Sequence, residues 1–198
     1  MNSTSRDAVK KLAIYGHVSA TPEKFAEVLD ASVATEVRAD CDAAIFIINP
    51  SAGIDNETIA RWREFDDFQT PRLVLVAVLD GMELDFDDAV LLANRLFDPL
   101  VTPFLVLHGE NGTPIGTISL DDFSTLDYST NPPTSGHADE ELQSLVQEFR
   151  EEYLELMVEM EDGAFSAGIL FPAIPVNTAN GLGLDIVKKY LSELPCRS

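Results

Sequence analysis

Two uninterrupted apolar runs constrain the fold of this chain more than any other feature. Residues 43–49 read AAIFIIN and residues 72–80 read RLVLVAVLD, and neither run alternates between apolar and polar positions. Such runs are typical of parallel β-strands that are covered on both faces. Residues 56–68, between the runs, carry apolar residues at helical spacing, which predicts a right-handed crossover helix. These residues are Ile59, Trp62, and Phe65 or Phe68.

The elements on either side of this unit extend the same pattern. Residues 10–16 contain a short apolar strand, and a helix follows for which Thr21 can supply the N-cap and Pro22 the first turn. A last strand is expected within residues 171–178 and a last helix within residues 184–194. The face that docks the first helix on the sheet carries Phe25, Val28 and Leu29. The alternation of strands and helices predicts an α/β fold with a mostly parallel sheet and flanking helices.

The middle of the chain interrupts this alternation. Residues 103–123 predict a hairpin around the turn GENG, and residues 129–137, STNPPTSGH, predict a loop. A helix is expected within residues 83–97, and the longest helix of the chain should follow the loop. Its apolar stripe predicts a face that belongs to the core rather than to a cofactor site. The stripe consists of Leu142, Leu145, Val146, Phe149, Tyr153, Leu156, Met157 and Met160.

The charge balance limits the choice of partners. The chain has 34 acidic and 13 basic side chains, and its net charge is −21. Binding to nucleic acid takes its affinity from clustered Lys and Arg, so we expect no nucleic-acid partner. Basic proteins are the favoured electrostatic partners, although an acidic surface that serves only solubility is an equal alternative.

Neither a membrane segment nor a metal centre is expected from the sequence. No apolar run approaches the ~20 residues that span a bilayer, and residues 1–11 lack a signal peptide, so a cytoplasmic location is expected. Cys41 and Cys196 have no CxxC spacing, and the three histidines, His17, His108 and His137, are isolated. We therefore expect no disulfide, no metal site and no cofactor.

Several short motifs, in this order, carry a resemblance to a known family. GHV at residues 16–18 precedes FAEVL, residues 39–54 read ADCDAAIFIINPSAGI, GTISL stands at residues 116–120, and residues 175–195 read PVNTANGLGLDIVKKYLSELP. The chain resembles the GTPase domain of elongation factor G and related translational GTPases. The resemblance implies a P-loop NTPase-like fold for a single domain, residues 1–198, with an insert subdomain of hairpin and long helix at residues 99–162.

The resemblance does not extend to the residues that bind phosphate. A phosphate-binding loop requires GxxxxGK followed by Ser or Thr. The glycines let backbone N–H groups approach the phosphate, the lysine neutralises its charge, and the hydroxyl binds magnesium. Here Gly16 matches the first glycine, whereas Thr21, Pro22 and Glu23 occupy the positions of the second glycine, the lysine and the hydroxyl residue. Proline removes a donor and glutamate adds a negative charge where the triphosphate would lie.

The guanine-reading motif is reduced in the same way. NKxD falls on residues 77–80, where only Asp80 is retained, and the Ser-Ala pair near the base falls on Asn177 and Thr178. A hydrogen bond to a charged group supplies about 1.5–3 kcal/mol, whereas micromolar binding requires about 8 kcal/mol. Asp80 is better explained as a cap of the strand end or of the next helix. Gly16, Asp80 and Asn177 are thus vestigial positions, and no catalytic residue is expected.

An acidic cluster near Asp80 has no pattern of a cation site. It consists of Asp80, Glu83, Asp85, Asp87 and Asp88. An EF-hand loop would add a glycine and a distal glutamate, so a solvated helix start is the better explanation.

The region between the first helix and the second strand is shortened. In the family it holds the first switch, two strands and the DTPGH motif, whereas this chain has only ASVATEVRADCD at residues 31–42. With those strands missing, residues 10–16 should form a sheet edge, which invites pairing. We expect this edge to be covered by the N-terminal segment or used in a homodimer or another protein contact.

Three functional hypotheses remain open from the sequence. The preferred one is a catalytically inactive GTPase-like domain that acts through protein contacts. The alternatives are a protein that retains weak guanine-nucleotide binding, and a fragment or remnant of a larger translation factor.

Overall fold

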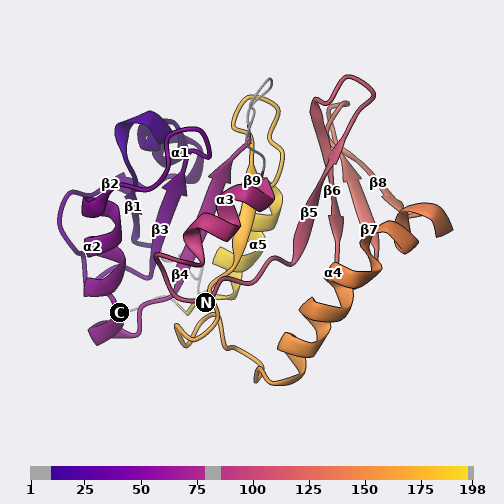
Figure 1. The fold of residues 1–198 in the computed structure, drawn as a ribbon. Coiled ribbons are helices and arrows are strands. Elements are labelled where there is room, and N and C mark those ends of the chain that lie inside the picture. The colour runs from indigo at the N-terminus through magenta and orange to yellow at the C-terminus, as the bar shows by residue number, and fades with distance from the viewer. Residues whose placement is uncertain (1–9, 79–85, 196–198) are drawn as a thin grey trace, which may run out of the picture.

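A five-stranded parallel sheet forms the centre of the molecule. The computed structural model describes residues 10–78 and 86–195. The strands lie in the order β2-β1-β3-β4-β9, and all neighbours are parallel (Figure 1). Their bounds are β1 Leu12–Tyr15, β2 Ser32–Val33, β3 Ala43–Ile48, β4 Arg72–Ala77 and β9 Ala173–Val176. The predicted α/β fold with a mostly parallel sheet is confirmed.

Helices cover both faces of this sheet. On β3, Ile45 and Ile47 belong to one core cluster, whereas Phe46 and Ile48 belong to the other, because successive side chains of a strand point to opposite faces. The first cluster includes residues of α1 and α5, and the second includes residues of α2 and α3. The helix bounds are α1 Pro22–Leu29, α2 Asn56–Glu64, α3 Phe86–Ala93 and α5 Leu184–Glu193. Two 3-10 helices, η1 Val18–Ala20 and η2 Asp66–Phe68, adjoin α1 and α2.

The predicted helical faces agree with the packing except at Val28. Phe25 and Leu29 are buried beneath α1, but Val28 is 36% exposed, because the helix is short and meets the sheet through a narrow stripe. Trp62 and Phe65 are buried and Phe68 is exposed, so Phe65 is the residue that completes the predicted face of α2.

A second, antiparallel sheet lies beside the first. It contains β5 Phe104–His108, β6 Pro114–Ser119, β7 Ser124–Asp127 and β8 Thr134–His137, in that order. The helix α4, Glu140–Val158, follows β8 and packs against this sheet (Figure 1). All five elements fall within residues 99–162. The hairpin of β5 and β6 and the long helix appear where the sequence predicts them, but β8 occupies part of a predicted loop. Its four residues are exposed, so no apolar pattern marks the strand.

The apolar stripe of α4 is less buried than the sequence predicts. Only Val146 is fully buried, whereas Leu145 and Phe149 are 70% and 48% exposed. Leu142, Val146 and Tyr153 pack against the sheet along one row, and Met157 joins the main core. A helix that meets a sheet along one row buries a narrower stripe than a helix inside a core, so only part of the predicted stripe contributes to the core.

The strand β1 is not an edge, which corrects the expectation for residues 10–16. Ala13 pairs with Ser32 and Ile14 pairs with Val33 of β2, and the amide of Ala34 donates to the carbonyl of Ile14 at 2.9 Å. The covering strand comes from the shortened segment after α1, not from the N-terminal segment. One short strand therefore remains where the sequence predicts none, and the physical basis for a homodimer through residues 10–16 is lost.

Candidate functional site

The loop after β1 occupies the place of a phosphate-binding loop. A Cβ atom on Gly16 would lie 2.8 Å from the backbone oxygen of Ile47 on β3. Glycine is therefore required here for the close packing of the loop on β3, whether or not phosphate binds. The vestigial position Gly16 has a structural explanation within the fold.

The backbone donors of this loop are used within the loop itself. The amide of Ser19 donates to Nδ1 of His17 at 3.2 Å, and the amide of Ala20 donates to the carbonyl of His17 at 2.8 Å. The amide of Thr21 donates to the carbonyl of Val18 at 3.0 Å. A phosphate cradle instead presents such N–H groups to the ligand. The 3-10 helix η1 thus closes the loop on itself.

The junction between η1 and α1 differs from the predicted cap. Thr21 has a φ of 50°, in the left-handed region, and its side chain makes no capping hydrogen bond. Thr21 occupies the predicted N-cap position of α1, but it also ends η1, and its carbonyl rather than its side chain accepts a hydrogen bond, from the amide of Lys24 at 3.0 Å. Pro22 stands at the start of α1, as predicted, and is buried, while Glu23 lies exposed in the first helical turn.

The shortened segment after β2 is fastened to the sheet through Tyr15. The hydroxyl of Tyr15 donates to the carbonyl of Glu36 at 3.1 Å and accepts from the amide of Arg38 at 3.1 Å. Burial raises the pKa of Tyr15, so the hydroxyl keeps its proton for the first of these bonds.

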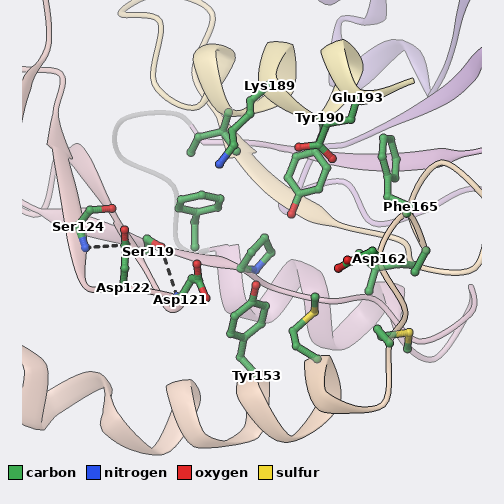
Figure 2. Close-up of a pocket in the computed structure, with 18 of the residues that line it drawn as sticks. Ser119, Asp121, Asp122, Ser124, Tyr153, Asp162, Phe165, Lys189, Tyr190 and Glu193 are labelled. Atoms are coloured by element: carbon green, nitrogen blue, oxygen red, sulfur yellow. Dashed lines mark hydrogen bonds between the residues drawn. The ribbon is translucent and has the colours of Figure 1, made fainter. Parts of the chain in front are cut away.

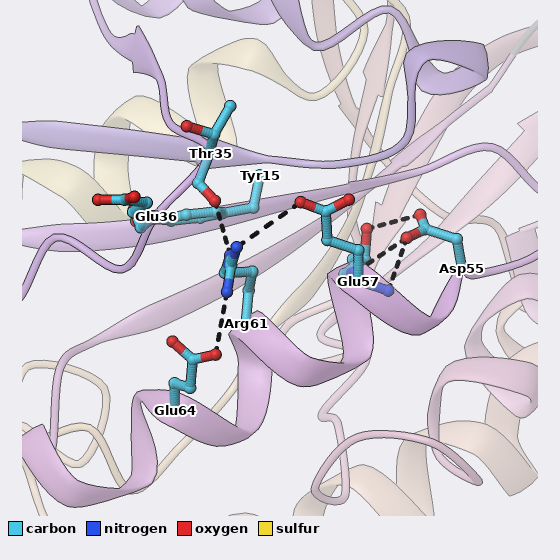
Figure 3. A network of polar contacts seen from close by, with 8 residues as sticks. Tyr15, Thr35, Glu36, Asp55, Glu57, Arg61 and Glu64 are labelled. Carbon is cyan, nitrogen blue, oxygen red and sulfur yellow. Dashed lines mark hydrogen bonds and ion pairs between the residues drawn. The ribbon is translucent and has the colours of Figure 1, made fainter.

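Arg61 of α2 makes a second set of contacts with the same segment. The Nε of Arg61 donates to the carbonyl of Thr35 at 2.7 Å, and the same guanidinium pairs with Glu64 at 3.0 Å and with Glu57 at 3.6 Å (Figure 3). The two carboxylates hold the guanidinium in the orientation that reaches Thr35. The segment that replaces the switch is therefore bonded to both β1 and α2.

A small hollow of about 260 Å³ lies between this segment, the loop and the start of α2. Its charged lining residues are Glu23, Asp55, Glu57 and Arg61. Asp55 caps α2 by accepting from the amides of Glu57 and Thr58 at 2.9 and 3.0 Å and from the Thr58 hydroxyl at 2.8 Å. Partial burial alone would raise the pKa of Asp55, but these hydrogen bonds outweigh it and lower the pKa. The hollow thus has an excess of negative charge.

Asn177 and Asp80 are the two remaining positions that the sequence analysis compared with a nucleotide site. Asn177 follows β9 and is buried, and its Oδ1 accepts from the amide of Ala179 at 2.9 Å while its carbonyl accepts from the amide of Gly181 at the same distance. Its side-chain oxygen is thus occupied within its own turn. Asp80 lies outside the described residues, as do Glu83 and Asp85 of the acidic cluster.

A second, larger hollow was not predicted from the sequence. It measures about 500 Å³ and lies between the second sheet, α4, the segment after α4, and α5 (Figure 2). Asp121, Tyr153, Asp162 and Tyr190 are among its lining residues. These residues are far apart in the chain, so no local motif marks the cavity.

Two further searches concern only residues 10–78 and 86–195. Within them, no group of three or more His, Cys, Asp or Glu side chains is placed to hold a metal ion. No helix of this part of the chain has the length and apolar character needed to cross a membrane.

Comparisons with known proteins agree with the fold. No protein-family model matches the chain. The elongation factor G-like proteins of two Mycobacterium tuberculosis strains, CDC 1551 and H37Rv, are each 24% identical over 163 residues, which is 72% of this chain. The chain spans 22% of the length of these relatives. A crystal structure from Thermus thermophilus superposes with a TM-score of 0.73 at 17% identity, covering 95% of this chain and 40% of that one. The chain is thus similar in sequence to elongation factor G-like proteins, and it shares its α/β fold with the structure from Thermus thermophilus.

Proposed function

We propose that this chain is a GTPase-like domain without nucleotide chemistry, and that it acts in the cytoplasm through contacts with other proteins. One observation carries the proposal. The amides of Ser19, Ala20 and Thr21, in the place of a phosphate cradle, donate to His17 and Val18 of the same loop. A triphosphate would have to break these bonds before it could use the donors.

The charge around the loop supports the same conclusion. Pro22 and Glu23 stand where the phosphate-binding motif needs a lysine and a hydroxyl residue, and Asp55 and Glu57 line the adjacent hollow. Arg61 is the basic residue of this lining, and it is engaged by Glu57 and Glu64. Negative charge next to the loop disfavours a triphosphate.

Isothermal titration with GTP and GDP in the presence of magnesium tests the loss of nucleotide binding. We expect no saturable binding at nucleotide concentrations up to about 1 mM. Any binding would then contribute less than about 4 kcal/mol of free energy. ATP is the matched ligand, because equal weak heats from GTP and ATP would reflect phosphate charge rather than guanine recognition. A low-micromolar affinity for GTP or GDP would overturn the proposal and favour the alternative of a weak guanine-nucleotide binder.

The proposed partner is a basic protein, because the net charge of −21 favours opposite charge. Cross-linking in the source cells followed by mass spectrometry should recover basic proteins whose association weakens as the salt concentration rises. Cross-links confined to acidic proteins, or association that is indifferent to salt, would contradict this assignment.

A further inference from the structure

The cavity between the second sheet, α4 and α5 has the size of a ligand site. Its volume of about 500 Å³ falls within the range of roughly 300–1,000 Å³ that is usual for small-molecule pockets. It shares no lining residue with the hollow beside the β1 loop. Binding of a ligand in this cavity would therefore be independent of the loss of nucleotide binding at the β1 loop.

Two tyrosines from different helices converge on this cavity. Tyr153 of α4 and Tyr190 of α5 point their hydroxyl groups into it from opposite sides (Figure 2). Within the described part of the chain, neither hydroxyl has a hydrogen-bond partner. The ring of Tyr190 packs edge-on against Phe165, with the centroids 5.2 Å apart, which fixes its position. Two partly buried hydroxyls without partners are free to bind a polar ligand.

The electrostatic environment keeps both hydroxyls neutral. Burial, and then the negative charge of Asp121, raise the pKa of Tyr153. Burial also raises the pKa of Tyr190, with smaller contributions from Tyr153, Glu193 and Asp121. The same groups that suppress ionisation of the tyrosines would attract a positive charge placed between them.

The carboxylates of the cavity are unequally engaged. Asp122 accepts from the amide of Ser124 at 3.0 Å, and Asp185 accepts from the hydroxyl of Tyr128. The carboxylates of Asp121, Asp162 and Glu193 make no hydrogen bond or ion pair with another described residue. Lys189 is the basic residue of the lining, and it cannot balance all of them.

The chemistry of the walls distinguishes between classes of ligand. An anion would be repelled by the carboxylates, and a neutral apolar molecule would leave both the carboxylates and the hydroxyls without partners. The acidic lining residues are not grouped as metal ligands within the described chain. Aromatic and thioether side chains, including Phe104, Phe165 and Met157, instead suit the alkyl stem and diffuse charge of an organic cation.

We propose that this cavity binds a protonated alkylamine or an alkylguanidinium group. Its N–H groups donate to the hydroxyls of Tyr153 and Tyr190 and to the carboxylates of Asp121 and Glu193, while its alkyl chain lies against the aromatic wall. The group can belong to a free polyamine or to a lysine or arginine side chain of a protein. The second source would rest on the proposed protein-binding function, whereas the first would not.

Isothermal titration with spermidine and with a tetralysine peptide, in about 150 mM salt to screen diffuse attraction, tests the proposal and separates the two sources. We expect saturable binding of at least one probe. Binding of spermidine alone would assign the cavity to a free amine, and binding of the peptide alone would assign it to a basic side chain of a protein. Absence of saturable binding of both would overturn the proposal, whatever the result of the GTP titration.

Matched variants separate the cavity from the general acidity of the surface. Asp121→Asn and Glu193→Gln should each weaken binding about tenfold, the loss of about one charge-assisted contact. Glu148→Gln makes the same change of charge on an exposed part of α4 outside the cavity and should leave the affinity within about twofold. An equal loss in all three variants would show diffuse charge attraction and overturn the proposal.

Tyr190→Phe keeps the ring and removes only the hydroxyl. We expect about a threefold to tenfold loss of affinity with an unchanged unfolding midpoint, which separates ligand contact from packing. Unchanged affinity in this variant would contradict the role of the tyrosine hydroxyls.

Discussion

The guanidinium of Arg72 lies over the indole ring of Trp62, with its Cζ 4.5 Å from the ring centroid. The same group lies 4.3 Å from the centroid of Phe171, so it is held between two aromatic faces. Its Nη1 donates to the carbonyl of Trp62 at 2.9 Å and to Asp66 at 2.7 Å, while the Trp62 indole N–H donates to Asp98 at 2.9 Å. A buried charge thus connects α2, β4 and the residues before β9.

Replacement of this arginine by lysine should destabilise the fold although the charge is kept. An ammonium group cannot stack between two rings or keep the fork of donors, so Arg72→Lys should lower the free energy of unfolding by about 1–3 kcal/mol. Urea unfolding followed by the fluorescence of Trp62, the single tryptophan, measures this change. Arg63→Lys, at an exposed position of α2, is the control, and a loss of the same size there would contradict the stacking argument.

Substitution of Gly16 tests whether the loop is held by packing. Gly16→Ala would bring a Cβ within 2.8 Å of the Ile47 oxygen on β3, and should cost about 1–3 kcal/mol of unfolding free energy. Gly109→Ala is the matched control, because its Cβ would meet no atom closer than 3.5 Å. Equal stability of the two variants would mean that the loop can shift at little cost.

Removal of the Arg61 side-chain contacts should loosen the segment that replaces the switch. Arg61→Met removes the donor to Thr35 while keeping much of the apolar stem, and we expect the amides of Ala34 and Arg38 to exchange about tenfold faster with solvent. Hydrogen exchange followed by NMR measures these rates. Arg63→Met on the same helix should leave the two amides unchanged, and equal protection in both variants would argue against fastening by Arg61.

Alkaline pH should destabilise the protein through its tyrosines. Burial, and then the hydrogen bond to Asp185, strongly raise the pKa of Tyr128 above its ordinary value of 10.0, and burial also raises the pKa of the other three tyrosines. The unfolded chain therefore loses protons first, so the stability is fully present below pH 10 and declines as the pH rises toward the folded-state values.

The variant Tyr128→Phe assigns part of this slope to one residue. It should cost about 1 kcal/mol at neutral pH, because the hydrogen bond to Asp185 is lost, and should flatten the decline above pH 10. Unfolding midpoints in urea between about pH 8 and 11 provide the measurement. A slope identical to that of the parent protein would contradict the assignment.

The parts of the fold that could be predicted are those with a strong local pattern. The uninterrupted apolar runs of β3 and β4 identified them as central strands, and both strands are buried along their entire length. The strand β2 escaped prediction because both of its residues are exposed and its position depends on contacts with Tyr15 and Arg61. The strand β8 escaped for the same reason, since hydrogen bonds to β7 and not apolar side chains hold it.

The loop after β1 was only partly predictable. The substitutions at Thr21, Pro22 and Glu23 were evident from the sequence, but the left-handed backbone of Thr21 and the internal use of the loop amides follow from three-dimensional packing. The cavity that contains Tyr153 and Tyr190 is assembled from segments distant in the chain, and such a site has no spacing that a sequence pattern can reveal.

The hydrogen bonds from Tyr15 and Arg61 to residues 35–38 bear on whether this segment can change conformation. In a GTPase the switch segment changes between two conformations as the nucleotide is hydrolysed, and the rate of hydrolysis sets how long the active state lasts. In this chain the corresponding segment is short and bonded to both β1 and α2, so we expect it to keep one position. Without a nucleotide-dependent switch, the activity of the domain would depend on its own cellular concentration and on the concentration of its partner.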